Sequence, residues 1–125
     1  MNEAVDYNQM RFLALLILLA ADICYQVKDC KRAVYFYNEA RVFATYAELL
    51  SIKMEALAAL AHIAMDLALY DSSMLFLKKS LQYAWKVKNI ECELLLYDSM
   101  GSCMYHMGIL RKATYFHNRF THGDV

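Results

Sequence analysis

The chain repeats a pattern of small and aromatic residues at intervals of 40 residues. Phe36, Phe76 and Phe116 have this spacing. Small residues share it at positions 21, 61 and 101, and again at positions 33, 73 and 113. A plain helical bundle has helical periodicity but no reason to repeat at a longer fixed interval. A period of this size is typical of stacked helical repeats, so the sequence favours a repeat array over a bundle.

Apolar residues within each unit recur every three or four positions, which is the period of an α-helix. The chain has no proline and 3 glycines, which favours long helices joined by short turns. We predict six helices, at about residues 10–28, 29–48, 49–69, 71–88, 90–107 and 111–121. Gly108 is expected to separate the last two, and Asp71 or Ser72 to cap the fourth.

The predicted fold is an all-α solenoid of three antiparallel hairpins within one domain, residues 1–125. The units cover about residues 10–48, 49–88 and 89–121. A lone helical hairpin cannot bury both of its faces, so the hairpins must stack to form a core. The small residues predict close approach of the two helices in each hairpin. Phe36, Phe76 and Phe116 are expected in equivalent buried places between hairpins.

The small, aromatic and glycine positions resemble the tetratricopeptide repeat. The third unit carries Gly101, Gly108, Ala113 and Phe120. The second carries Leu60, Ala61, Tyr70, Leu77 and Ser80, and the first carries Ala20, Ala21, Ala33, Tyr37 and Ala40. The period is longer than the family's usual length of about 34 residues. It is similar to the long repeats of kinesin light chain and of the spindle-orientation adaptors that bind heterotrimeric G proteins. In this chain, no Trp opens a unit and no Pro closes one.

Hydrophobic residues make up 60% of the chain, against roughly half in a typical soluble domain. We therefore expect apolar surface to be covered by a second copy, by a neighbouring segment of a longer parent protein or by a partner. Residues 12–21 are the most apolar run, but the run is about half the length of a membrane span and ends at Asp22. We predict a buried helix there rather than membrane insertion. The residues expected to mediate self-association are Leu15, Leu18 and Leu19.

Charge and cysteine usage narrow the class of partner. Lys and Arg balance Asp and Glu at 13 each, so the chain lacks the basic surface that nucleic acid or anionic lipid requires. No signal-peptide pattern precedes the apolar run, and the four cysteines form no CxxC pair. We predict an intracellular, cytoplasmic protein with reduced thiols and no nucleic-acid or membrane partner. The likeness to kinesin light chain adds association with the cytoskeleton as an expectation.

The resemblance implies a concave groove, lined by the first helix of each hairpin, that binds a partner protein. The residues expected there are Asp22, Tyr25, Gln26, His62, Met65, Asp66, Ser102, Tyr105 and His106. Stacking would place Tyr25, Met65 and Tyr105 in one row, and Asp22, His62 and Ser102 in another. This mixture suits a peptide or helix with apolar anchors and a Lys or Arg. The alternative is that Tyr25, Met65 and Tyr105 only pack against one another inside the array.

Other functions have less support. Repeats that clamp chaperone carboxylates need a basic groove, whereas the matching positions here hold Leu18, Ala58, Asp98, Asp22, His62 and Ser102. His62 and Asp66 stand at i and i+4, a spacing that suits an acid/base pair but is common on helix surfaces. The spacing of Cys103 with His106, His117 and His122 matches no zinc site. We predict an adaptor domain without enzymatic activity, cofactor or metal; the alternatives are a homodimerising module and, with less support, an enzyme.

Overall fold

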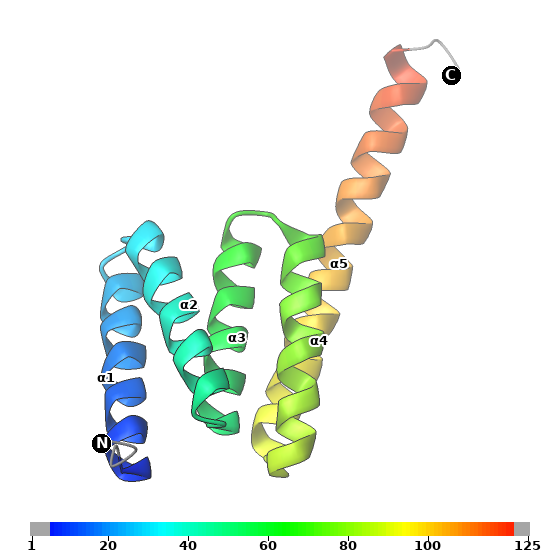
Figure 1. Cartoon of the computed structure of the whole chain (residues 1–125). Coiled ribbons are helices and arrows are strands. Elements are labelled where there is room, and N and C mark those ends of the chain that lie inside the picture. Colours follow the sequence, from blue (N-terminus) through cyan, green and yellow to red (C-terminus); the bar gives the residue numbers. More distant parts are fainter. Residues whose placement is uncertain (1–5, 122–125) are drawn as a thin grey trace.

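The computed structural model describes residues 6–121, without the side chains of Phe116, Arg119, Phe120 and Thr121. These residues form five helices and no strand (Figure 1). The helices are α1 (Tyr7–Gln26), α2 (Cys30–Tyr46), α3 (Leu50–Asp66), α4 (Tyr70–Val87) and α5 (Ile90–Thr121). The predicted all-α class is confirmed. The predicted break at Gly108 is wrong for this structure, because α5 passes through it as one helix of 32 residues.

Four turns join the helices at a constant spacing of 20 residues. The residue with positive φ in each turn is Lys28 (65°), Glu48 (58°), Ala68 (60°) or Lys88 (57°). Each turn closes the preceding helix with two backbone hydrogen bonds, which satisfy carbonyls that the helix leaves unpaired. In the first turn, Asp29 N–H donates to Cys24 O at 2.8 Å and Lys28 N–H donates to Tyr25 O at 3.0 Å. Gly108 stands 20 residues after Lys88 but lies inside α5.

Short polar side chains start three of the helices. The capping residues Asp6, Asp29 and Asn89 each accept a hydrogen bond from a backbone N–H of the first turn that follows. The predicted cap of α4 at Asp71 or Ser72 is wrong, because that helix begins at Tyr70 and has no side-chain cap. Asp71 lies instead in the first turn of α4. Its negative charge there interacts favourably with the positive end of the helix dipole and so stabilises the helix.

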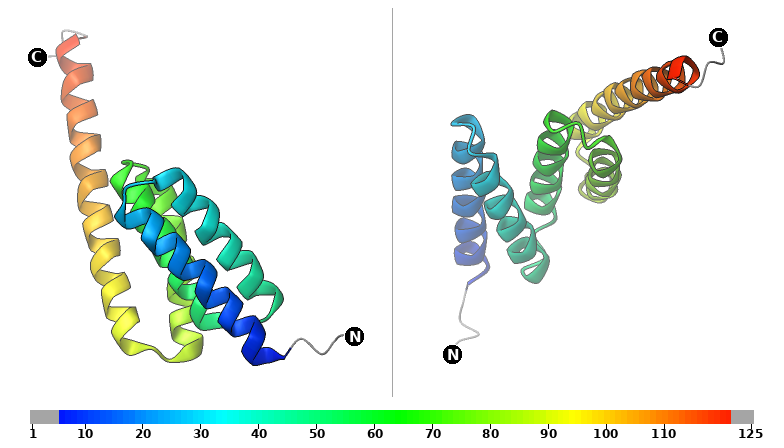
Figure 2. Two further views of the ribbon diagram at one scale, coloured as in Figure 1. Left: turned by 90° about the vertical axis from the view of Figure 1, so that its left-hand side faces the viewer. Right: turned by 90° about the horizontal axis from the view of Figure 1, so that it is seen from above.

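Each helix packs against the next one along the chain, and α1 also contacts α3. The C-terminal part of α5 extends beyond the ends of the other helices (Figures 1 and 2). Two core clusters result, one centred on α1, α2 and α3 and the other on α3, α4 and α5. Phe76 packs against both clusters, so it joins the two halves of the core.

The small residues of the first two units make the predicted close approach. Ala21, Ala33, Ala61 and Ser73 are fully buried. Ser73 Oγ also donates a 2.8 Å hydrogen bond to Ala61 O, which fixes α4 against α3. A larger side chain at any of these positions would separate the two helices of its hairpin.

The third unit departs from this pattern. Gly101 and Ala113 are exposed, because the straight α5 brings no second helix over them. Among the described side chains of α5, Leu96 and Cys103 are the buried ones. The expectation that three phenylalanines share a buried place is also corrected: Phe36 and Phe76 are half-buried. The fully buried side chains are their neighbours Tyr37 and Leu77, and the side chain of Phe116 lies outside the described residues.

Candidate functional site

The nine predicted groove residues lie on α1, α3 and α5, which are the first helices of the three units. Tyr25 and Met65 are half-buried, and the other seven are exposed. Seven of the nine make contacts that link neighbouring helices or line a shared pocket; the exceptions are Gln26 and Tyr105. The surface between α1, α3 and the middle of α5 is therefore held by hydrogen bonds and contains a pocket, whereas the surface near Tyr105 is exposed to solvent.

A hydrogen bond connects α1 to α3 directly. The Tyr25 hydroxyl donates to Asp66 Oδ2 at 2.5 Å. This bond raises the pKa of Tyr25 to about 12, with partial burial and the negative charge of Asp66 adding to the effect. The bond holds the Tyr25 ring at the boundary between the first two units, where an incoming apolar side chain would meet it.

A second hydrogen bond orients Asp22. The Tyr37 hydroxyl, on α2, donates to Asp22 Oδ1. Burial raises the pKa of Tyr37, and the bond to Asp22 raises it further. In the sequence Tyr37 stands out only as a repeat position, although its hydroxyl fixes a predicted groove residue. The sequence does not indicate that Tyr37 contacts Asp22, because the two residues lie on different helices and their contact depends on how those helices pack.

Glu55, an exposed residue of α3, is an acidic neighbour of Asp22 that sequence reasoning missed. Burial raises the pKa of its carboxyl group, and the negative charge of Asp22 adds to the shift. Burial likewise raises the pKa of Cys92, with Glu55 contributing. Side chains from α1, α3 and α5 are therefore within electrostatic reach of one another. Glu55 stands seven residues before His62, two helical turns away on the same face of α3, and this spacing could have identified it.

A pocket of about 180 Å³ lies beside α3, α4 and α5. It is lined by Ala61, His62, Met65, Ser73, Leu77, Asp98, Ser99 and Ser102. Three predicted groove residues, His62, Met65 and Ser102, thus share one hollow. Asp98 adds a carboxylate to it. The volume is below that of a typical cofactor site, so it suits a single side chain of a partner.

The two groove histidines have the same local geometry. His62 Nδ1 lies 2.8 Å from Ala58 O, and His106 Nδ1 lies 2.8 Å from Ser102 O. With the proton on Nδ1, each ring bonds to the carbonyl four residues earlier in its own helix. The opposite ring nitrogen, Nε2, is then an acceptor for a partner's donor.

Tyr105 and His106 take part in a separate set of ring contacts that reaches Tyr70 at the start of α4. The His106 ring stacks on Tyr70 with centroids 5.6 Å apart, and the Tyr105 ring meets His106 edge-on at 5.7 Å. Tyr105 is 68% exposed. The alternative in which Tyr25, Met65 and Tyr105 only pack against one another is therefore wrong, because Tyr105 remains on the surface. The three do not form one packed row.

The outer side of α1 carries a separate apolar surface. The prediction of a buried helix at residues 12–21 is wrong for much of this run, because Phe12, Leu15 and Leu19 are exposed, and Ile23 beyond the run is exposed too. The assignment of Leu18 to this surface is wrong, because Leu18 is buried in the first core cluster. By length and composition, α1 is the one helix within residues 6–121 that could span a membrane.

The described histidine, cysteine and acidic side chains of this region do not cluster as ligands of a metal ion would. Within residues 6–121, no three or more His, Cys, Asp and Glu side chains are grouped to hold a metal ion. His122, considered with Cys103 from the sequence, lies outside the described residues. Asp66 accepts from Tyr25, whereas His62 bonds to its own helix. His62 and Asp66, the predicted i, i+4 pair, therefore have different hydrogen-bond partners.

Comparison with models of known protein families, with curated proteins and with solved structures finds no match to this chain. The resemblance to tetratricopeptide repeats stays a prediction.

Proposed function

We propose that this chain is a scaffold or adaptor domain that binds a basic, amphipathic segment of a partner protein along α1, α3 and α5. The observation that carries the proposal is the set of contacts that joins the three helices: the hydrogen bond from Tyr25 on α1 to Asp66 on α3, and the pocket that His62, Asp98 and Ser102 line between α3 and α5.

Glu55 adds a carboxyl group to α3 whose pKa is raised by burial and by the negative charge of Asp22. Two like charges held close together favour a cation between them. A Lys or Arg of a partner would relieve the repulsion.

Further acidic groups extend this negative surface. Asp66 stands on α3 at the bond with Tyr25, and Asp98 lines the pocket beside α5. The whole chain is neutral, with 13 basic and 13 acidic residues, so the acidity of the groove is local. A local field of this kind selects the charge of a partner and its orientation more than it sets the overall affinity.

Apolar anchoring would come from Met65 and Tyr25. Met65 and Leu77 line the 180 Å³ pocket, and the flexible thioether of Met65 can adapt to different side chains. Tyr25 supplies an aromatic surface that is already fixed by its hydroxyl. A Leu, Met or Ile of the partner fits the pocket while a basic residue one helical turn away reaches the carboxylates. This arrangement is the helix-in-groove mode of peptide recognition.

The finer fold assignment belongs to the same proposal. The constant turn spacing and the buried small pairs support a tetratricopeptide-type array. We further propose that this array belongs to a longer, intracellular protein. In such an array the first helices form the binding face. The groove residues of this chain lie on those helices, which supports adaptor function over catalysis.

Selection of peptides on the immobilised chain tests the proposal. A displayed library of helical peptides is selected on the wild type, and the winners are titrated against Glu55→Gln/Asp66→Asn. The matched control is Glu39→Gln/Asp71→Asn, which neutralises exposed acids on α2 and α4. We expect Lys or Arg enrichment and at least a tenfold weaker binding to the groove variant, with the control unchanged. Peptides without a basic residue, or equal binding to both variants, would reject the proposal.

A second candidate function is self-association through the outer side of α1. The observation that favours it is the run of exposed apolar side chains at Phe12, Leu15, Leu19 and Ile23. Exposed apolar patches of this kind mark interaction sites in soluble proteins. If α1 mediates self-association, Leu15→Lys/Leu19→Lys should lower the mass measured by light scattering to that of one chain. Retention of the wild-type mass would exclude α1 from the interface.

A further inference from the structure

We propose that α5 exists in two conformations, the straight helix and a hairpin that turns at Gly108. In the hairpin, residues 110–121 fold back and pack antiparallel on residues 90–107 of the same chain. The structure shows the straight conformation. The proposal concerns the outer face of α5, formed by positions 94, 97, 101 and 104. This face is not part of the predicted groove, so the proposal does not depend on peptide binding.

Gly108 stands where the regular spacing of the turns places the next one. The residues with positive φ in the four turns are 20 residues apart, and Gly108 is 20 residues beyond Lys88. A residue with a side chain meets a steric cost at such a φ, whereas glycine does not. Glycine also lowers helix stability relative to alanine. A turn at Gly108 is therefore less costly to the backbone than the turns that the chain makes at Ala68 and Lys88.

The outer face of α5 is exposed, although the equivalent face of α3 is buried. Its four positions fall within an arc of about 80° at 3.6 residues per turn. The equivalent residues, 40 positions apart, are Met54 and Leu94, Leu57 and Tyr97, Ala61 and Gly101, and Ala64 and Met104. The members on α3 are at most 5% exposed, whereas Leu94, Tyr97 and Met104 are at least 44% exposed. The outer face of α5 therefore lacks the helix that covers its equivalent.

Two hydrogen bonds show that α4 is the helix that covers the equivalent face of α3. Ser73 Oγ donates to Ala61 O and Ser80 Oγ donates to Met54 O, both at 2.8 Å. Helix α4 follows α3 directly, across a short turn. By the same connection, the segment that follows a turn at Gly108 would cover the outer face of α5.

Small residues flank Gly108 at the same distances as in the second hairpin. Ala61 and Ser73 stand seven residues before and five residues after the positive-φ residue of their turn, and both are fully buried. Gly101 and Ala113 stand seven residues before and five residues after Gly108, and both are exposed. On the straight helix the directions of these two positions differ by about 120°, so one neighbouring helix cannot contact both. A turn at Gly108 would instead make them face each other across the hairpin, as Ala61 and Ser73 do.

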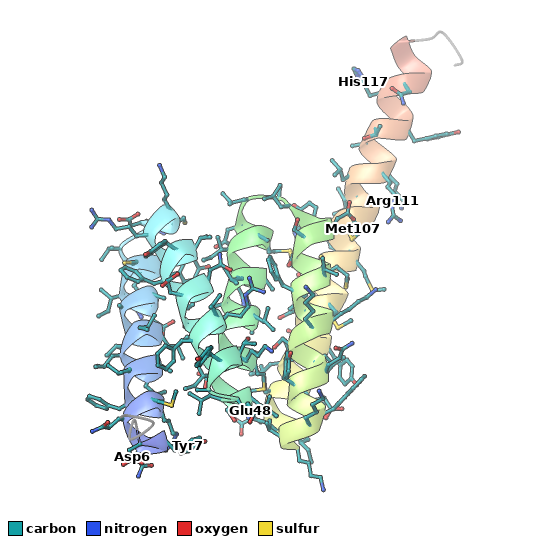
Figure 3. The ribbon with its side chains drawn as sticks, viewed as in Figure 1. Asp6, Tyr7, Glu48, Met107, Arg111 and His117 are labelled. Carbon is teal, nitrogen blue, oxygen red and sulfur yellow. The ribbon has the colours of Figure 1, made fainter. Side chains whose placement is uncertain are left out.

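The C-terminal segment of α5 extends past the other helices in the straight conformation. Figure 3 shows Arg111 and His117 on this segment, with Met107 near its base. Ile109 and Leu110 are 49% and 55% exposed. A helix of about a dozen residues is only marginally stable in water without tertiary packing. Folding back would lose helical hydrogen bonds around the turn and would bury apolar surface of both halves. These opposing contributions allow both conformations to be populated.

Disulfide formation at equilibrium measures the hairpin. In Gly101→Cys/Ala113→Cys the two Cα atoms are about 18 Å apart along the straight helix, at 1.5 Å per residue, whereas a disulfide needs them within about 7 Å. Gly101→Cys/Lys112→Cys is the matched control, because Ser72, the equivalent of Lys112, is exposed on the second hairpin. Each variant is equilibrated at low concentration in a glutathione redox buffer, and mass spectrometry identifies the linked cysteines. The parent and the single variants control for the four native cysteines.

We expect an internal disulfide between positions 101 and 113, with an equilibrium constant at least tenfold above that of the 101–112 pair. Adding Gly108→Ala should lower the constant at least fivefold, because alanine favours the straight helix and disfavours a positive φ. Adding Thr114→Ala is the control, because residue 114 is helical in both conformations. Absence of the internal disulfide, equal constants for the two cysteine pairs, or no effect of Gly108→Ala would overturn the proposal.

Discussion

The bond between Tyr25 and Asp66 should contribute measurably to the stability of the fold. A hydrogen bond to a charged group contributes about 1.5–3 kcal/mol net when it is well protected. Asp66 is exposed, so solvent reduces the contribution, and we expect a coupling energy of about 1 kcal/mol. The double-mutant cycle consists of Tyr25→Phe, Asp66→Ala and the double variant. Urea unfolding followed by circular dichroism gives the free energy of unfolding of each protein at pH 7.

The pH dependence gives the same prediction a second readout. The pKa of Tyr25 is raised to about 12 in the folded chain, above the ordinary value of 10.0. The bond therefore contributes its full stability below pH 10, and that contribution is lost as the pH rises towards 12. The difference in stability between wild type and Tyr25→Phe should shrink over this range. Tyr46→Phe, at an 86% exposed side chain, is the control. A coupling energy near zero at pH 7 would refute the reasoning.

Two further predictions concern the fold. Ala68→Gly should stabilise the chain by about 0.5–1 kcal/mol, because Ala68 has a φ of 60° that glycine adopts without steric strain; a loss of stability in urea unfolding would contradict this. Leu77→Ala should destabilise it by about 2–5 kcal/mol, because Leu77 is fully buried between α3 and α5; a change below about 1 kcal/mol in the same assay would show that the second core cluster is loosely packed.

The sequence predicted much of the fold because the repeat pattern reports packing directly. Small residues at 21, 33, 61 and 73 are buried where helices approach closely, as their spacing indicated. The continuity of α5 was missed because glycine permits a turn but does not require one. A glycine inside a helix costs about 1 kcal/mol, which the neighbouring helix formers Leu110, Lys112 and Ala113 can offset.

The candidate site was predicted in part. His62, Met65 and Ser102 share a pocket, because residues on one face of successive first helices lie close together. Leu18 was misplaced because the run at residues 12–21 is apolar throughout, so its periodicity does not show which face points inward. The hydrogen bonds to Asp22 and Asp66 depend on how three helices are placed in space. The positions of these helices relative to one another cannot be read from a single sequence.

Binding along α1, α3 and α5 can be located with methyl resonances of the methionines. Met65 lies in the groove pocket, whereas Met10 is near the start of α1 and Met104 is on the exposed face of α5. The protein is labelled at methionine methyl groups, assigned by single Met→Leu variants and titrated with a selected basic peptide. We predict a saturable shift of the Met65 resonance, with those of Met10 and Met104 unchanged. A shift at Met10 or Met104 without one at Met65 would contradict the groove as the binding site.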